Sequence, residues 1–138
     1  MDRERILSKI AELEGYLEEL RIILPKDFEE FQKIEKKRAC ERLLQIAIEA
    51  VIDICYLLVR DLRLGLPSDE EDIFDKVEKA GIIQGELQRT LRKMRGFRNI
   101  LVHEYGHVDD WIVYQMTRQG FESFDMFRNA IFHFLRSR

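Results

Sequence analysis

Proline and cysteine are scarce in this chain of 138 residues, and long hydrophobic runs are absent. With only Pro25 and Pro67 to interrupt them, helices can be long. Cys40 and Cys55 lie in helical patterns without metal-ligand spacing, which favours two buried free thiols and a reducing, cytoplasmic location. The longest mostly apolar stretch, residues 46–59, contains two acids and is too short for a bilayer, so no membrane segment is expected.

Apolar residues recur with a helical period along the whole chain, and no strand pattern is present. The pattern predicts helices over about residues 2–24, 27–64, 68–80, 84–105 and 111–136, with Asp27 capping the second and Ser68 capping the third. No repeat or linker divides the chain. We therefore expect one domain, residues 1–138: an all-α, antiparallel up-and-down bundle of four main helices plus one short helix.

The second half of the long helix predicted over residues 27–64 is apolar on more than one face. Such a helix lies either at the centre of a bundle or against a partner chain. Glu49 and Asp53 interrupt this part four residues apart. Acids there are costly to bury unless they are paired, so they either face solvent or meet a basic group such as Arg98.

Residues 98–105 carry the residues best suited to chemistry: Arg98, Asn99, His103 and Tyr105 within two helical turns. Histidine titrates near neutral pH and can act as a general base or acid. Arginine stays charged and can bind a phosphate through two parallel hydrogen bonds. These groups can cleave RNA without metal or cofactor: the base deprotonates the 2′-hydroxyl, which attacks phosphorus, and the cation stabilises the phosphorane. We predict Arg98 and His103 as catalytic, with Asn99 and Tyr105 in support.

Net charge is −3, which does not favour general nucleic-acid binding, but its distribution is uneven. Residues 87–103 contain basic residues and no acid. The predicted RNA contacts are the four that precede Arg98, namely Arg89, Arg92, Lys93 and Arg95. A solvated helix face explains the same run equally well.

Arg98 and His103 are five residues apart, which places them about 140° apart around a helix axis. A single helix therefore cannot easily direct both at one phosphate. Two copies facing each other across a two-fold axis can, so the spacing predicts a composite site in a homodimer.

His103, Glu104 and His107 also match the H-E-x-x-H pattern of zinc peptidases. Gly106 and the polar turn after it indicate that the helix ends there, and a third ligand is not evident. A hydrogen-bonded structural histidine is a further interpretation of His103. The nuclease interpretation includes no metal.

The run Arg98-Asn99-Ile100-Leu101-Val102-His103-Glu104-Tyr105 resembles the R-x4-H-x-Y motif of HepT-type toxins of the HEPN superfamily. The resemblance covers nearly the whole chain, including residues 47–54, 65–67 and 81–83. It implies a homodimeric, metal-independent endoribonuclease toxin with its cleft at the dimer interface. It also implies a minimal nucleotidyltransferase antitoxin that attaches AMP to the motif tyrosine, here Tyr105. The alternative is a HEPN module that binds a nucleotide or partner without cleaving RNA.

Overall fold

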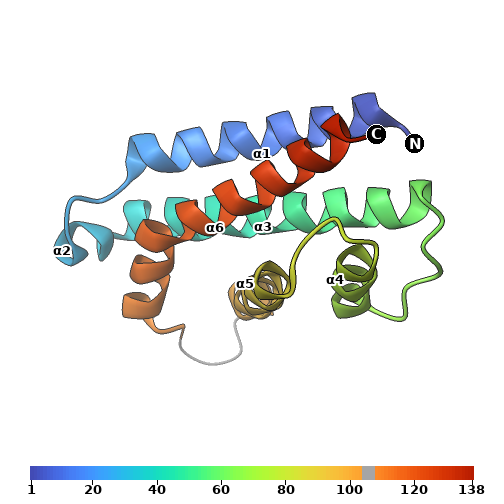
Figure 1. Cartoon of the computed structure of the whole chain (residues 1–138). Coiled ribbons are helices and arrows are strands. Elements are labelled where there is room, and N and C mark those ends of the chain that lie inside the picture. Colours follow the sequence, from blue (N-terminus) through green and yellow to red (C-terminus); the bar gives the residue numbers. More distant parts are fainter. Residues whose placement is uncertain (104–107) are drawn as a thin grey trace.

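The computed structural model describes residues 1–103 and 108–138, and those ranges contain six helices and no strand (Figure 1). The bounds are α1 Arg3–Ile23, α2 Phe28–Phe31, α3 Ile34–Asp61, α4 Glu70–Lys79, α5 Gly85–His103 and α6 Asp110–Arg136. The predicted all-α fold is confirmed. In Figure 1, α1 and α3 run side by side, and the later part of α6 (red) runs obliquely along them, while α4 and α5 pack beneath α3 and are seen nearly end-on.

The predicted long helix is divided in two. Asp27 caps α2 as expected, accepting the Glu30 N–H at 2.8 Å, but α2 ends after one turn. Lys33 adopts extended backbone angles before α3 begins. The break lets Phe28 and Phe31 pack on Tyr114 of α6, with ring centroids 5.5 and 5.6 Å apart. The expectation of one continuous helix was wrong because this tertiary contact, not proline or glycine, redirects the chain.

The cap before α4 is one residue later than predicted. Asp69 accepts the Asp72 N–H at 2.8 Å, and Asp72 in turn accepts the Ser68 N–H at 3.0 Å. Carboxylates cap helices as well as hydroxyls do, so adjacent Ser68 and Asp69 were not separable from the sequence. The correction matters for the site, because it makes Glu70 the first residue of α4.

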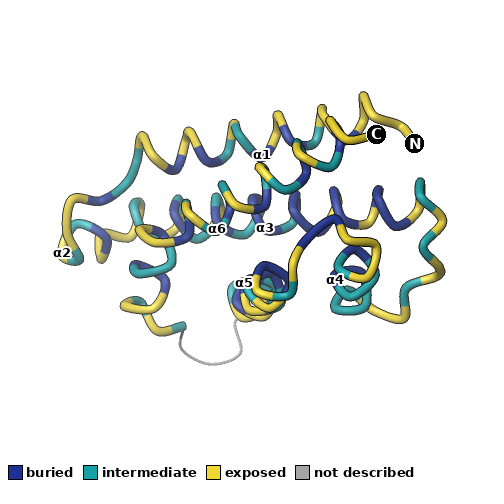
Figure 2. The backbone as a smooth tube through the Cα atoms, in the orientation of Figure 1, coloured by how far each residue is buried: buried dark blue, intermediate teal, exposed yellow. Residues whose placement is uncertain are grey.

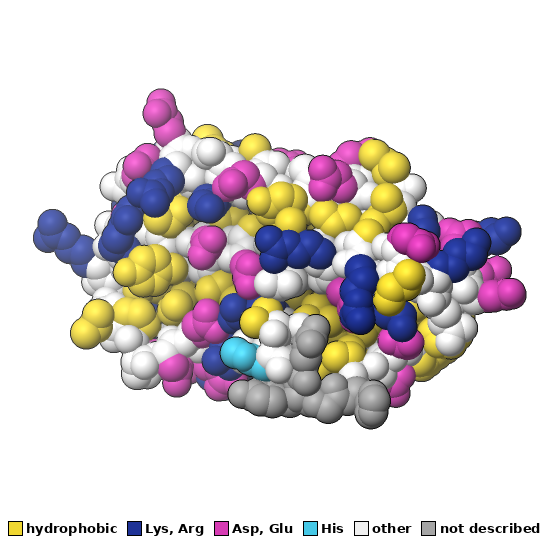
Figure 3. All heavy atoms as spheres, turned by 180° about the vertical axis from the view of Figure 1, so that it is seen from behind, with side chains coloured by type: hydrophobic (Ala, Val, Ile, Leu, Met, Phe, Trp, Pro, Cys, Tyr) yellow, Lys and Arg dark blue, Asp and Glu magenta, His cyan; other side chains and the backbone are white. Residues whose placement is uncertain are grey.

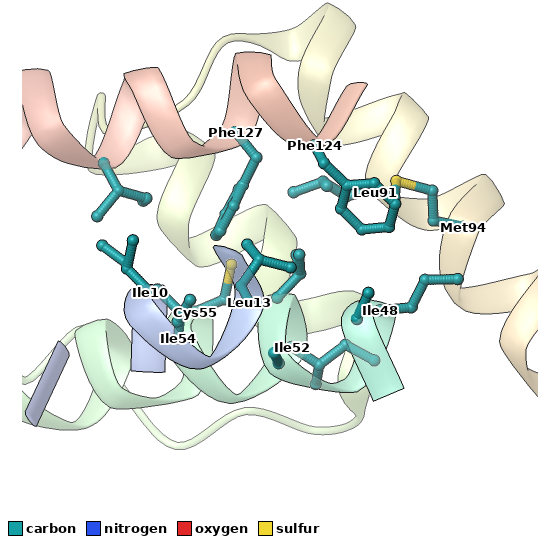
Figure 4. Close-up of a cluster of buried hydrophobic side chains, with 14 of the residues drawn as sticks. Ile10, Leu13, Ile48, Ile52, Ile54, Cys55, Leu91, Met94, Phe124 and Phe127 are labelled. Atoms are coloured by element: carbon teal, nitrogen blue, oxygen red, sulfur yellow. The ribbon is translucent and has the colours of Figure 1, made fainter. Parts of the chain in front are cut away.

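Helix α3 is the centre of the bundle and contacts every other helix. Buried residues follow it to Val59, shown as dark blue segments in Figure 2. In Figure 4, Ile48, Ile52 and Cys55 of α3 face side chains from α1, α5 and α6. Apart from the exposed Tyr56, most of the apolar second half of α3 is therefore buried by helices of the same chain.

The hydrophobic contacts of α6 continue this core. Phe124, Phe127 and Ile131 are buried, whereas Trp111 remains half exposed at the start of the helix. Both cysteines are free and buried, as expected. Across the described ranges, no helix is both long and apolar enough to cross a membrane.

Candidate active site

Arg98 lies where α3, α4 and α5 meet. Its Nη2 donates to Glu70 Oε1 of α4, and its Nη1 lies 3.6 Å from Glu49 Oε2 of α3. Only 14% of the Arg98 side chain is exposed. Its Nε is buried and has no hydrogen-bond partner within the described ranges. The guanidinium therefore lies between two carboxylates, with a small part of the side chain exposed at the protein surface.

Two acids of α3, Glu49 and Asp53, have different surroundings. Glu49 approaches Arg98, whereas Asp53 is 56% exposed and lies 3.7 Å from Lys9 Nζ of α1. One turn of helix thus decides which acid faces the candidate site and which faces solvent.

A ladder of ion pairs joins α4 to α5 around Arg98. Glu70 Oε1 also accepts from Arg95 Nε at 2.9 Å, and Glu71 lies 3.4 Å from Arg95 Nη1 and 3.1 Å from Arg92 Nη1. Asp75 accepts from Arg92 Nη2 with both oxygens at 2.8 Å. Two of the four predicted RNA contacts, Arg92 and Arg95, are therefore already paired with carboxylates of the same chain.

The other two predicted RNA contacts lie on the exposed face of α5. The face is formed by residues spaced three and four apart: Arg89, Lys93, Gly96, Ile100 and His103. Arg89 and Lys93 form no ion pair with any residue that the structure describes. This face therefore presents two available cations and leads directly to the predicted catalytic histidine.

His103 is the last residue of α5 and is exposed. Asn99 is half-buried, whereas Ile100 and Val102 expose 49% and 42% of their surfaces. The site side chains thus divide around the helix: Arg98 points to α3 and α4, and His103 lies on the exposed face. This agrees with the angular separation expected from their spacing.

Three predictions depend on at least one residue outside the described ranges, namely Glu104, Tyr105 or His107. They are the modification of Tyr105, its support of the site, and a zinc site formed by His103, Glu104 and His107. Within the described ranges, no group of three or more His, Cys, Asp or Glu side chains is placed to hold a metal ion. Figure 3 shows a histidine beside the grey residues, on a face where basic, acidic and apolar side chains are mixed.

The sequence reasoning did not identify Glu70, Glu71 and Asp75 as neighbours of the site. A signal was present: an acidic run, residues 69–72, opens α4, and residues 87–103 of α5 contain basic residues without an acid. Adjacent helices with such opposite charge favour pairing across their interface.

Comparison with known proteins places this arrangement in a family. The sequence model described as "Ribonuclease HepT-like" matches residues 13–131. The chain belongs to the HepT-like ribonuclease family. This HepT-like chain is 29% identical over 126 residues to a protein of Shewanella oneidensis named "mRNA nuclease HepT", covering 91% of this chain and 95% of the relative. It is 36% identical over 115 residues to a "Putative RNase" of Archaeoglobus fulgidus, covering 82% and 80%.

The fold comparison agrees. A solved structure of the tri-AMPylated HEPN toxin of Shewanella oneidensis in complex with its MNT antitoxin superposes with a TM-score of 0.86. Sequence identity is 30%, and the match covers 95% of this HepT-like chain and 98% of that toxin.

Proposed function

We propose that this HepT-like chain is a metal-independent endoribonuclease, the toxin of a toxin–antitoxin pair, with Arg98 and His103 as its catalytic residues. One observation carries the proposal: a positioned, mostly buried arginine and an exposed histidine stand five residues apart on one helix. The names of the nuclease relatives support RNA cleavage as the reaction.

The proposed reaction uses the 2′-hydroxyl of the substrate. His103 accepts its proton as general base, and the 2′-oxygen attacks the adjacent phosphorus. Arg98 stabilises the charge that develops on the phosphorane oxygens. The bond from phosphorus to the 5′-oxygen then breaks, the leaving oxygen takes up a proton, and a 2′,3′-cyclic phosphate remains. DNA lacks the nucleophile and is not cleaved.

The proposed active unit is a homodimer in which Arg98 of one copy works with His103 of the other. We propose the exposed end of α5 as the contact between copies, because Ile100 and Val102 are exposed there, whereas most apolar residues in the second half of α3 are already buried by the same chain. Mixing Arg98→Ala and His103→Ala protomers tests this. Each variant alone should be severely impaired, but a mixed dimer keeps one site with both native residues, so activity recovers only if the site is shared. No recovery despite measured subunit exchange would contradict the shared site.

RNA is proposed to follow the exposed face of α5 toward His103. Arg89 and Lys93 are exposed and form no ion pair within the described ranges, so they can offer their charge to phosphates along this route. Arg92 and Arg95 contact RNA only if they leave Asp75, Glu71 and Glu70, so their first role is to join α4 to α5.

The proposed partner is a minimal nucleotidyltransferase antitoxin that attaches AMP to Tyr105. Support comes from the AMPylated Shewanella toxin, which was solved with its MNT antitoxin. Tyr105 follows Arg98 by seven residues in the sequence, a spacing of about two helical turns. An attached AMP phosphate could then pair with Arg98 and exclude RNA by charge and bulk.

The test is RNA cleavage by purified protein in EDTA. Arg98→Ala should cost at least about a hundredfold, the range seen when a charge-stabilising donor is lost. His103→Ala should abolish cleavage, whereas His133→Ala, on the exposed surface of α6, should not change it. RNA binding without cleavage by the native protein would instead support a non-catalytic HEPN module.

A further inference from the structure

We infer that Glu70, the first residue of α4, is a positioning residue that holds Arg98 in its catalytic orientation. This inference rests on the proposed function, because Arg98 must take part in cleavage for its orientation to matter. Nothing in the motif itself points to Glu70, which lies 28 residues earlier in the chain.

Glu70 stands between two arginines of α5. Its Oε1 accepts from Arg98 Nη2 and from Arg95 Nε, the latter at 2.9 Å. Glu71 holds Arg95 from the other side, and Glu49 lies near Arg98. The charges therefore alternate from α4 through α5 to α3. In such a chain each guanidinium has a carboxylate on two sides, which restricts a long and otherwise flexible side chain.

The arrangement restrains Arg98 and still leaves it able to bind a phosphate. A guanidinium has five N–H donors: one on Nε and two on each Nη. Nε is buried, so the edge that carries it is not available to a substrate. Glu70 engages one donor of Nη2, and Glu49 lies beside Nη1. Each Nη therefore keeps at least one N–H that it can donate to a phosphate.

Glu70 holds Arg98 more directly than Glu49 does. Glu49 Oε2 is 3.6 Å from Arg98 Nη1, beyond hydrogen-bond distance, and the same oxygen lies 3.3 Å from Gln45 Nε2. The backbone of Glu70 is also fixed, because the Asp69 cap defines the start of α4. Its loss should therefore release Arg98 from the position set by three helices.

Glu71 supplies a matched control. It is the next residue of α4, carries the same charge and pairs with Arg92 and Arg95, but it does not contact Arg98. Glu71→Gln therefore removes one carboxylate from the ladder and leaves the Arg98 contacts in place. An effect of Glu70→Gln that Glu71→Gln lacks must therefore come from the contact with Arg98 or from Glu70 Oε1, the oxygen that Arg95 and Arg98 share.

The first experiment measures kcat and KM for RNA cleavage. Glu70→Gln should lower kcat at least about tenfold and change KM less than about threefold, because orientation matters most in the transition state. Glu71→Gln should stay within about twofold of the native protein in kcat. A rise in kcat/KM of Glu70→Gln would show that the carboxylate competes with the substrate phosphate and would overturn the positioning role.

The second experiment repeats Glu70→Gln in an Arg98→Ala background. A residue that acts through Arg98 should cost less than about twofold once Arg98 is gone, whereas a general structural defect should lower the rate by the same factor as before. If Arg98→Ala alone cleaves at the native rate, the proposed active site fails and Glu70 has nothing to position. If Arg98→Ala is slow and Glu70→Gln is fast, only the positioning inference fails.

A measurement without RNA tests the restraint itself. In ¹⁵N spectra of arginine side chains, the Arg98 Nε–H signal, assigned by its loss in Arg98→Lys, should report an ordered group in the native protein. Glu70→Gln should lower the order of that group and Glu71→Gln should leave it unchanged. An Arg98 signal that is equally ordered in Glu70→Gln would overturn the inference whatever the cleavage rates.

Discussion

The four basic residues before Arg98 should separate into two functional pairs. Arg89 and Lys93 are exposed and have no ion-pair partner in the part of the chain that the structure describes. Arg95 is bound to Glu70 and Glu71. We expect Arg89→Ala combined with Lys93→Ala to weaken RNA binding without affecting stability. Arg95→Ala should instead lower stability without weakening RNA binding.

The magnitudes follow from the contacts. Each phosphate contact to single-stranded RNA contributes about 0.7 to the slope of log affinity against log salt, so losing two should flatten the slope by about 1.4. Removing two exposed cations should change the free energy of unfolding by less than about 0.5 kcal/mol. The Arg95 side chain is 23% exposed, so its two ion pairs are partly screened, and Arg95→Ala should cost about 1 kcal/mol, or about 3 °C in Tm.

Two assays decide between these outcomes. Fluorescence anisotropy with a 2′-O-methyl RNA, which the proposed mechanism cannot cleave, gives affinity over a series of KCl concentrations. Thermal unfolding followed by circular dichroism gives Tm. An unchanged salt slope in the Arg89 and Lys93 double variant would refute the proposed RNA route. A flattened slope in Arg95→Ala at native Tm would refute the structural role of the ladder.

Three further outcomes are expected. Gly96→Ala should stabilise the isolated chain by up to about 1 kcal/mol in urea unfolding, because the added Cβ meets open space on an exposed helix face; a loss of stability would reveal a close neighbour there. Burial raises the pKa of Cys40 to about 11, so its thiol should resist iodoacetamide at pH 8 until the protein unfolds. The thiol of the unfolded chain ionises at lower pH than the buried one. The contribution of Cys40 to stability should therefore fall as pH rises from about 9 toward 11. Tyr105→Phe lacks the acceptor hydroxyl and should escape modification when coexpressed with a nucleotidyltransferase antitoxin, and a nucleotide adduct in its intact mass would exclude Tyr105 as the acceptor.

Most of the helices were predictable from local pattern. Pro25 ends α1 close to the expected residue, and Asp27 caps the next helix as expected. The break at Lys33 was not predictable, because the sequence there contains no proline or glycine and the turn depends on Phe31 packing against α6. Propensity describes a segment by itself, whereas this boundary depends on a distant one.

The candidate site was predictable only in part. The spacing of Arg98 and His103 correctly placed them on different sides of α5. The choice of Glu49 over Asp53 as the acid near Arg98 depended on how α5 docks on α3, which no local pattern records. The role of Glu70 depended on the same tertiary information. Its ion pair with Arg95 uses a residue that the sequence had presented as part of an exposed basic surface.

The most direct test of the central claim is the chemistry of the ends that cleavage produces. RNA should be incubated with the native protein in EDTA and the products analysed by mass spectrometry. Attack by the 2′-hydroxyl, promoted by His103 and Arg98 alone, predicts fragments ending in 2′,3′-cyclic phosphate with 5′-hydroxyl partners. Fragments ending in 3′-hydroxyl with 5′-phosphate partners, or cleavage that stops in EDTA and returns with a divalent metal, would contradict the account.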